Sequence, residues 1–204
     1  MILVGMLDSP YVRRVAISMK LMGLPFEHQA VSVFRHMDRF RAINPVIKAP
    51  TFVCDDGTVL MDSTLILDYL EHCVAAGNGL MPPGGEPRKQ ALRLIGLATA
   101  SNEKNVALVY EKEQRPPAKF HAAWFERSTE QVHAAFGELE KAMADARPWF
   151  GGARMNAADV AVAVAWRFGQ FYNAKEIPES RYPALAAYSR RAEALPEFAA
   201  TPLE

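Results

Sequence analysis

Cysteine, net charge and long apolar runs are all scarce in this sequence of 204 residues. The two cysteines, Cys54 and Cys73, form no C-x-x-C pair, so we interpret both as small buried hydrophobes and expect no metal site. The 23 Lys and Arg residues balance 23 Asp and Glu residues, which argues against nucleic acid or an anionic membrane surface as a partner. The Ala- and Val-rich run at 157–166 is far shorter than the ~20 apolar residues of a membrane helix.

Apolar residues, in contrast, are plentiful. They make up 50% of the chain, which is enough to bury a sizeable core. At roughly 100–200 residues per domain, the length fits one large domain or two small ones. Residues 1–5 (MILVG) form a strand-like run and lack the basic segment and apolar stretch of a secretory signal. We therefore expect a cytoplasmic protein.

The first 78 residues alternate between strand and helix patterns. Predicted strands cover 2–6, 26–33, 51–54 and 59–61, and predicted helices cover 10–22, 35–42 and 63–73, the second of these being a short polar helix or a loop. Residues 55–58 (DDGT) give a strong hairpin signal between the last two strands. The order β-α-β-α-β-β-α predicts an α/β domain over residues 1–78.

The rest of the chain reads as helical. Residues 79–87 hold the densest run of Gly and Pro, and we interpret them as a linker between two domains. Apolar spacing predicts helices at 92–109, 120–143, 156–171 and 184–195. The third is apolar on most sides, which places it at the centre of an all-α domain over 88–204.

Two serines stand where helices are predicted to begin. Ser9 precedes Pro10 at a turn from strand to helix, and Ser63 follows Asp62 before an apolar helix. Free N–H groups and the positive end of the helix dipole stabilise an anion at such a position. Taken alone, each serine can equally be a plain helix cap, which is the more common role.

Two further segments have both a functional and a structural interpretation. The Ala49–Pro50 bond precedes a strand, and a cis bond there would turn the backbone of Ala49 toward an extended peptide ligand. An ordinary trans proline that starts the strand is the alternative. Of Arg13 and Arg14, one can hold an anionic ligand, and the alternative is solvated surface charge for both.

Together, in this order and spacing, the segments resemble one family, the cytosolic glutathione transferases. The matching segments are 9–15 (SPYVRRV), 44–50 (NPVIKAP), 62–70 (DSTLILDYL), 149–152 (WFGG) with 156–159 (NAAD), 182–188 (YPALAAY) and 195–198 (LPEF). The resemblance covers nearly the whole chain. It implies a thioredoxin-like N-terminal domain (βαβαββα) and an all-α C-terminal helical bundle, joined by the linker at 79–87.

The resemblance also implies a glutathione site in the N-terminal domain. Ser63 and the start of its helix would hold the γ-glutamyl carboxylate, and Asp62 would bind the γ-glutamyl amine or shape the turn. The backbone of Ala49, before a cis Pro50, would pair with the cysteinyl amide. Lys48 would reach the glycyl carboxylate.

Ser9 takes the place of the activating hydroxyl in serine-type, bacterial-like members of this family. It would donate a hydrogen bond to the glutathione thiolate, with Arg14 nearby. Lowering a thiol pKa from near 8.5 by about two units requires on the order of 3 kcal/mol. The expected reaction is transfer of glutathione to a hydrophobic electrophile, a detoxification chemistry with glutathione as co-substrate and no metal. Glutathione-dependent peroxidase, dehalogenase or isomerase activity on the same scaffold is the alternative.

A second pocket, for the electrophile, is expected between the domains. Its candidate residues are Tyr11, Ser101, Asn102, Asn105, Val109, Tyr110 and Trp166. Helix packing is the alternative role for each. The family resemblance further implies a homodimer. A different function stays open, because some relatives with this fold are non-catalytic ligand carriers or regulatory protein-binding modules.

Asn156 and Asp159 have a structural interpretation that we prefer outright. They form the pattern of a capping box, with Asn at the cap and an acidic residue three positions later. Loss of the Asp159 carboxylate is therefore expected to cost roughly 1 kcal/mol or more.

Overall fold

The computed structural model describes residues 1–146 and 148–203, and their contacts form two compact units. The N-terminal unit consists of Met1–Met81 together with Leu195–Glu204, and the helical unit is Pro82–Ala194. Position 204, the end of the predicted all-α domain, lies outside the described residues. The sequence analysis placed the whole C-terminal end with the helices, whereas the structure places the last residues in the N-terminal unit.

A four-stranded mixed sheet lies at the centre of the N-terminal unit. Its strands are β1 (Ile2–Val4), β2 (Glu27–Gln29), β3 (Thr51–Val53) and β4 (Val59–Met61), in the order β2-β1-β3-β4. The pair β1–β2 is parallel, and the pairs β1–β3 and β3–β4 are antiparallel. The second strand is shorter than the predicted 26–33 because Val31 leaves the sheet and packs with Val4 and Phe40 in a small core cluster.

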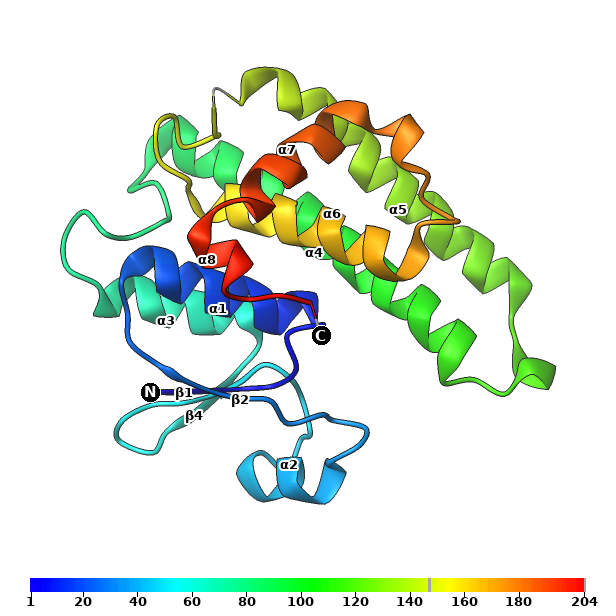
Figure 1. The fold of residues 1–204 in the computed structure, drawn as a ribbon, viewed down its shortest axis with the longest axis horizontal. Helices are drawn as coiled ribbons and strands as arrows, with labels where there is room; N and C mark the ends of the chain where they lie inside the picture. Colours follow the sequence, from blue (N-terminus) through cyan, green and yellow to red (C-terminus); the bar gives the residue numbers. More distant parts are fainter. Residues whose placement is uncertain (147, 204) are drawn as a thin grey trace. The chain divides into compact units, whose positions relative to one another are not determined.

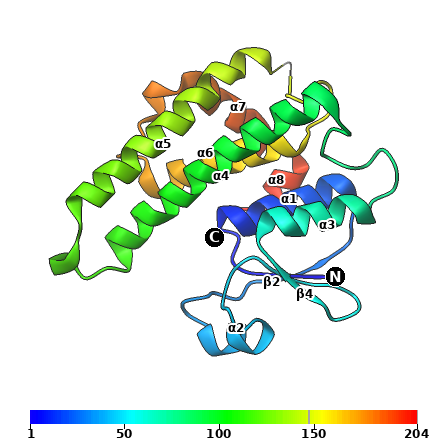
Figure 2. The ribbon, with the colours of Figure 1, turned by 180° about the vertical axis from the view of Figure 1, so that it is seen from behind.

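Three helices complete the predicted order, which confirms the thioredoxin-like α/β fold. They are α1 (Pro10–Met22), α2 (Met37–Ile43) and α3 (Ser63–Cys73). Helices α1 and α3 lie side by side over one face of the sheet, and α2 lies beyond the other face (Figures 1 and 2). Helix α1 begins at the predicted Ser9 cap and ends at Gly23, whose φ of 71° suits glycine.

The end of the chain packs against α1. Helix α8 (Pro196–Ala199) contacts α1 within the N-terminal unit. Arg13, only 1% exposed, donates from Nε to the carbonyl oxygen of Thr201 at 2.8 Å and from Nη2 to that of Phe198 at 3.5 Å. Arg14 is also buried, at 3% exposed. The interpretation of both arginines as solvated surface charge is therefore wrong, because each guanidinium has partners far away in the sequence.

The helical unit contains four main helices. They are α4 (Gly85–Glu113), α5 (Ala122–Ala142), α6 (Ala157–Asn173) and α7 (Pro183–Glu193), with short 3-10 turns at Pro117–Lys119, Met143–Asp145 and Glu179–Arg181. Helix α4 packs against both α5 and α6, and α6 also contacts α7; the long α4–α5 pair is seen from behind in Figure 2. Helix α6 is buried on most sides, as its apolar sequence predicts. Helix α4 begins inside the predicted linker, at Gly85.

The capping box at the start of α6 is confirmed, and it is part of a larger network. The Asn156 side chain caps the helix, and the Asp159 carboxylate accepts from the Asn156 N–H at 2.7 Å. The same carboxylate accepts from the N–H groups of Phe150 at 2.7 Å and Gly151 at 3.2 Å, and from the Tyr188 hydroxyl. Burial raises the pKa of Asp159, and these donors oppose that rise.

Candidate functional site

The sheet register brings three of the predicted site segments to one edge. Val4, at the end of β1, pairs with Thr51 at the start of β3, and Thr51 pairs with Met61 at the end of β4. The turn to Ser9, the loop before β3 and the start of α3 therefore all leave the sheet at the same edge. Segments that are far apart in the sequence, such as those at Ser9 and Ser63, converge there.

The Ser9 hydroxyl is only loosely held by its own helix. Its Oγ accepts from the Val12 N–H at 3.4 Å, which is long for a hydrogen bond of this kind. Gly5 leads into this turn with a φ of 142°. A Cβ at Gly5 would lie 2.6 Å from a methyl of Val12 and 3.2 Å from the Cβ of Ala49. The close approach between the Ser9 turn and the Ala49 loop therefore requires glycine.

The loop before β3 has the cis Ala49–Pro50 bond that the family resemblance implied. Within residues 1–146 and 148–203, no hydrogen bond engages the N–H or C=O of Ala49. Lys48 beside it is exposed. An extended peptide can thus pair with the Ala49 backbone, while a cation stands beside that edge.

A buried side-chain network fixes this loop, and the sequence analysis did not find it. Asn44, 1% exposed, donates to the Thr51 hydroxyl at 2.8 Å and accepts from the Val46 N–H at 3.0 Å. The Thr51 hydroxyl in turn donates to the Lys48 carbonyl at 2.8 Å. The available signal was an Asn before one proline and a Thr after the other, since both residue types commonly bond to nearby backbone.

The start of α3 combines a helix N-terminus with a buried arginine. Asp62 is the cap, with a φ of 73°, and its Oδ1 accepts from the Thr64 N–H at 2.8 Å. Arg14 donates to the Ser63 hydroxyl at 3.3 Å and to the Thr64 hydroxyl at 3.4 Å. Burial lowers the pKa of Arg14 to about 10, opposed by Asp62 and Tyr11. The guanidinium therefore stays charged at neutral pH and lies directly at the helix start.

Several of the predicted electrophile residues in the helical unit are engaged in packing. Ser101 donates to the Ala98 carbonyl at 2.8 Å, and Trp166, 3% exposed, packs edge-on against Phe136 and Tyr182. These are the contacts of helix packing, the alternative that the sequence left open. Val109 is buried and Tyr110 is 45% exposed. Asn102 is 1% exposed, and its Oδ1 has no hydrogen-bond partner among the described residues.

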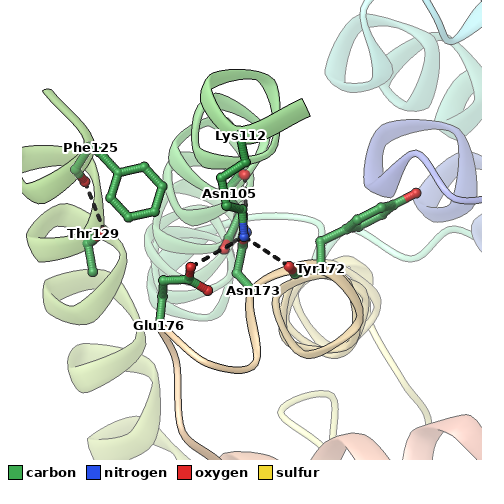
Figure 3. A network of polar contacts seen from close by, with 7 residues as sticks. All are labelled: Asn105, Lys112, Phe125, Thr129, Tyr172, Asn173 and Glu176. Carbon is green, nitrogen blue, oxygen red and sulfur yellow. Dashed lines mark hydrogen bonds and ion pairs between the residues drawn. The ribbon is translucent and has the colours of Figure 1, made fainter. Parts of the chain in front are cut away.

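Asn105 belongs to a polar network that joins α4 to the end of α6 (Figure 3). Its Oδ1 accepts from the Asn173 side chain at 2.9 Å, and its Nδ2 donates to the Ser101 carbonyl at 3.0 Å. Lys112 donates to the Asn173 side chain at 2.7 Å and to the Tyr172 carbonyl at 3.2 Å. The lysine therefore satisfies carbonyl groups at the end of α6.

Replacement of Asn105 by alanine distinguishes packing from a pocket role. The variant removes the side-chain acceptor of the Asn173 amide and keeps the Asn105 backbone carbonyl at 3.2 Å. We therefore expect a loss of about 1 kcal/mol in the free energy of unfolding, with an unchanged KM for the electrophile. Thermal melting and steady-state kinetics measure the two effects. Lys175→Ala, at an exposed position near the same helix end, is the control. An altered electrophile KM with unchanged stability would assign Asn105 to the pocket.

Comparison with known proteins identifies the family. Residues 3–76 match the N-terminal domain of glutathione S-transferases, and residues 122–191 match their C-terminal domain. The chain belongs to the glutathione S-transferase family. Among the described helices, none has the length and apolar character needed to cross a membrane. The described residues also include no group of three or more His, Cys, Asp or Glu that could hold a metal ion.

Individual relatives align over most of the chain. A probable glutathione S-transferase of Oryza sativa subsp. japonica is 25% identical over 198 residues, covering 93% of this chain and 82% of that protein. A glutathione S-transferase structure from Methylobacterium radiotolerans, in complex with glutathione sulfonate, is 28% identical, with a TM-score of 0.89 over 98% of this chain and 93% of that one. A glutathione transferase family member from Pseudomonas fluorescens Pf-5, with bound glutathione, is 28% identical. Its TM-score is 0.87, and the alignment covers 100% of this chain and 98% of that one.

Proposed function

We propose that this enzyme, a glutathione S-transferase, binds glutathione along the common sheet edge and activates its thiol with Ser9, as a serine-type member of the family. Glutathione as co-substrate is supported by family membership and by the glutathione-bound relatives. The observation that carries the proposal is the register Val4–Thr51–Met61, which aligns the Ser9 turn, the Ala49 backbone and the start of α3.

Each end of glutathione has a chemical counterpart along this edge. The γ-glutamyl carboxylate would bind the Ser63 hydroxyl and the free N–H groups of α3, above the buried charge of Arg14. The Asp62 carboxylate would face the γ-glutamyl amine. The cysteinyl amide would pair with the Ala49 backbone before cis Pro50. The exposed Lys48 would attract the glycyl carboxylate.

Ser9 would act as a hydrogen-bond donor and not as a nucleophile. Its hydroxyl, weakly held by the Val12 N–H at 3.4 Å, would donate to the glutathione sulfur and stabilise the thiolate. The thiolate would then attack an electrophilic carbon, the sulfur–carbon bond forming as the leaving group departs with its electron pair. A pKa lowered by about two units, worth on the order of 3 kcal/mol, would leave most of the bound thiol ionised at neutral pH.

The electrophile in this proposal is a hydrophobic small molecule. Tyr11, half-buried on α1 and close enough to oppose the lowered pKa of Arg14, would contact it. Asn102, Val109 and Tyr110 of α4 stay in the proposed set. Ser101, Asn105 and Trp166 leave it, because their contacts already account for them.

We extend the proposal to assembly and location. Helix α3 exposes Leu65 and Tyr69, at 65% and 40%, and α4 exposes Leu92 at 52%. Large apolar side chains of this kind suit a homodimer interface. Cys54 is buried as predicted, whereas Cys73 is exposed, so the interpretation of Cys73 as a buried hydrophobe is wrong. Both cysteines are free thiols, which suits a reducing compartment such as the cytoplasm.

Glutathione binding measured by calorimetry tests the proposal. We expect Ser63→Ala to weaken binding about 10- to 50-fold, because a hydrogen bond to a charged group contributes roughly 1.5–2.5 kcal/mol. Ser63→Thr keeps the hydroxyl and should retain most of the affinity. If the wild-type protein binds no glutathione up to millimolar concentration, the proposal fails, and a non-catalytic carrier or protein-binding role takes its place.

A further inference from the structure

The helical unit has a pocket where α4 connects to α5, and its lining residues differ from those proposed to bind glutathione. We name it the α4–α5 pocket. It has a volume of about 430 Å³ and is lined by Arg115, His121, Ala123, Trp124 and Arg127. Pockets for small molecules commonly measure roughly 300–1,000 Å³. The lining combines two arginines with a large aromatic ring and a histidine.

One buried carboxylate holds two of the lining residues in place. Glu111, near the end of α4, is 5% exposed. Its Oε2 lies 2.8 Å from Arg115 Nε, and its Oε1 accepts from the His121 N–H at 2.7 Å. The described contacts of Arg115 use only Nε, so its two terminal nitrogens remain available to a ligand. The pocket is thus preorganised by a residue that does not line it.

His121 presents a donor to the pocket. Its Nδ1 lies 3.1 Å from the Trp124 N–H, so this ring nitrogen must accept. The other ring nitrogen, Nε2, is then left to donate. The same contact fixes the backbone at Trp124. The Trp124 side chain is 44% exposed, and the centroid of its ring lies 5.8 Å from Lys104 Nζ.

Arg127 is an exposed arginine on α5 that lines this pocket. Across residues 1–146 and 148–203, no hydrogen bond or ion pair engages its guanidinium. It shares the pocket with Arg115, so two cations line one small space. Guanidinium groups bind carboxylates through paired N–H donors, and a tryptophan face stacks on flat rings.

We propose that the α4–α5 pocket binds an aromatic carboxylate. The ring would stack on Trp124, and the carboxylate would accept from Arg127, from the terminal nitrogens of Arg115 and from His121 Nε2. This site makes no use of Ser9, Ala49 or Ser63. The proposal therefore goes beyond the proposed transferase function, and an experiment can contradict either one without contradicting the other.

Calorimetry with 2-naphthoate, and with the uncharged 2-naphthalenemethanol, tests the ligand class. We expect 2-naphthoate to bind with a Kd on the order of 100 µM, consistent with ordinary ligand efficiencies for a molecule of this size. The alcohol keeps the ring and lacks the charge, so it should bind at least about 10-fold more weakly. Equal affinity for the two compounds, or no binding of either, overturns the proposal.

Two matched pairs of variants locate the site. Arg127→Met should weaken 2-naphthoate binding about 10-fold, whereas Arg167→Met, at an exposed arginine on α6, should leave it unchanged. Trp124→Leu should weaken binding by a similar factor, and Phe171→Leu, at a side chain of nearly equal exposure, 47%, should not. Thermal melting of each variant checks that it is folded. If Ser63→Ala or added glutathione abolishes 2-naphthoate binding while Arg127→Met has no effect, the carboxylate occupies the glutathione edge and the proposal is wrong.

Discussion

Ser9→Ala should lower kcat/KM for glutathione transfer about 100-fold and change glutathione affinity less than about threefold. Ser9 is proposed to contact only the sulfur, and the rest of the tripeptide is proposed to bind the Ala49 backbone and the start of α3. Without the hydroxyl, the pKa of the bound thiol should return toward its solution value near 8.5. The ultraviolet absorbance of the thiolate, followed against pH in the saturated complex, measures that shift directly.

The fold should tolerate this change. The Ser9 cap on Val12 is long, at 3.4 Å, so its loss should cost at most about 1 kcal/mol. Ser9→Thr keeps a hydroxyl in place and should restore most of the thiolate signal. An alanine variant that keeps both the thiolate absorbance and the rate would show that another group, such as Tyr11, activates the sulfur.

The largest effect on stability is expected from Asp159→Ala. Its carboxylate is fully buried and accepts from the N–H groups of Phe150, Gly151 and Asn156 and from the Tyr188 hydroxyl. Alanine leaves these buried donors without an acceptor, so we expect a loss of about 4 kcal/mol. For a chain of this length, the melting temperature should fall by about 10 °C.

Two comparisons separate the parts of this network. Asn156→Ala removes only the cap and should cost about 1 kcal/mol. Asp145→Ala, at an exposed acidic position, should leave the melting temperature unchanged within error. If Asp159→Ala melts like the wild type and yet loses activity, the residue serves the reaction, and the structural assignment fails.

The sequence predicted features that depend on neighbours along the chain. Ser9 with Pro10, residues 55–58, and Asn156 with Asp159 each specify a turn or a cap within a few residues, and the structure has all three. The strand and helix patterns, with the Gly- and Pro-rich run at 79–87, predicted two domains, and the family resemblance implied the thioredoxin-like fold of the first.

Contacts between distant residues were not predictable from such signals. Arg14 meets Ser63 across 49 positions, and Tyr188 meets Asp159 across 29. A pair of adjacent arginines is typical of an exposed surface, and nothing in the local pattern indicates that a serine hydroxyl or a chain end will bury them. The loss expected for Asp159→Ala rises from roughly 1 kcal/mol or more to about 4 kcal/mol for the same reason, because the Tyr188 hydroxyl and the Phe150 amide lie outside the capping box.

The hydrogen bond from Arg13 to Thr201 spans 188 positions. It therefore joins the earliest and the latest synthesised segments of the N-terminal unit. Helix α1 is synthesised early, and the Arg13 guanidinium cannot form these hydrogen bonds until Phe198 and Thr201 have been synthesised. The N-terminal unit therefore begins to be synthesised first, but its packing is completed only after the helical unit has been synthesised. Loss of residues 195–203 would leave Ser9, Ala49 and Ser63 in the chain and still remove the carbonyl groups of Phe198 and Thr201 that accept from Arg13.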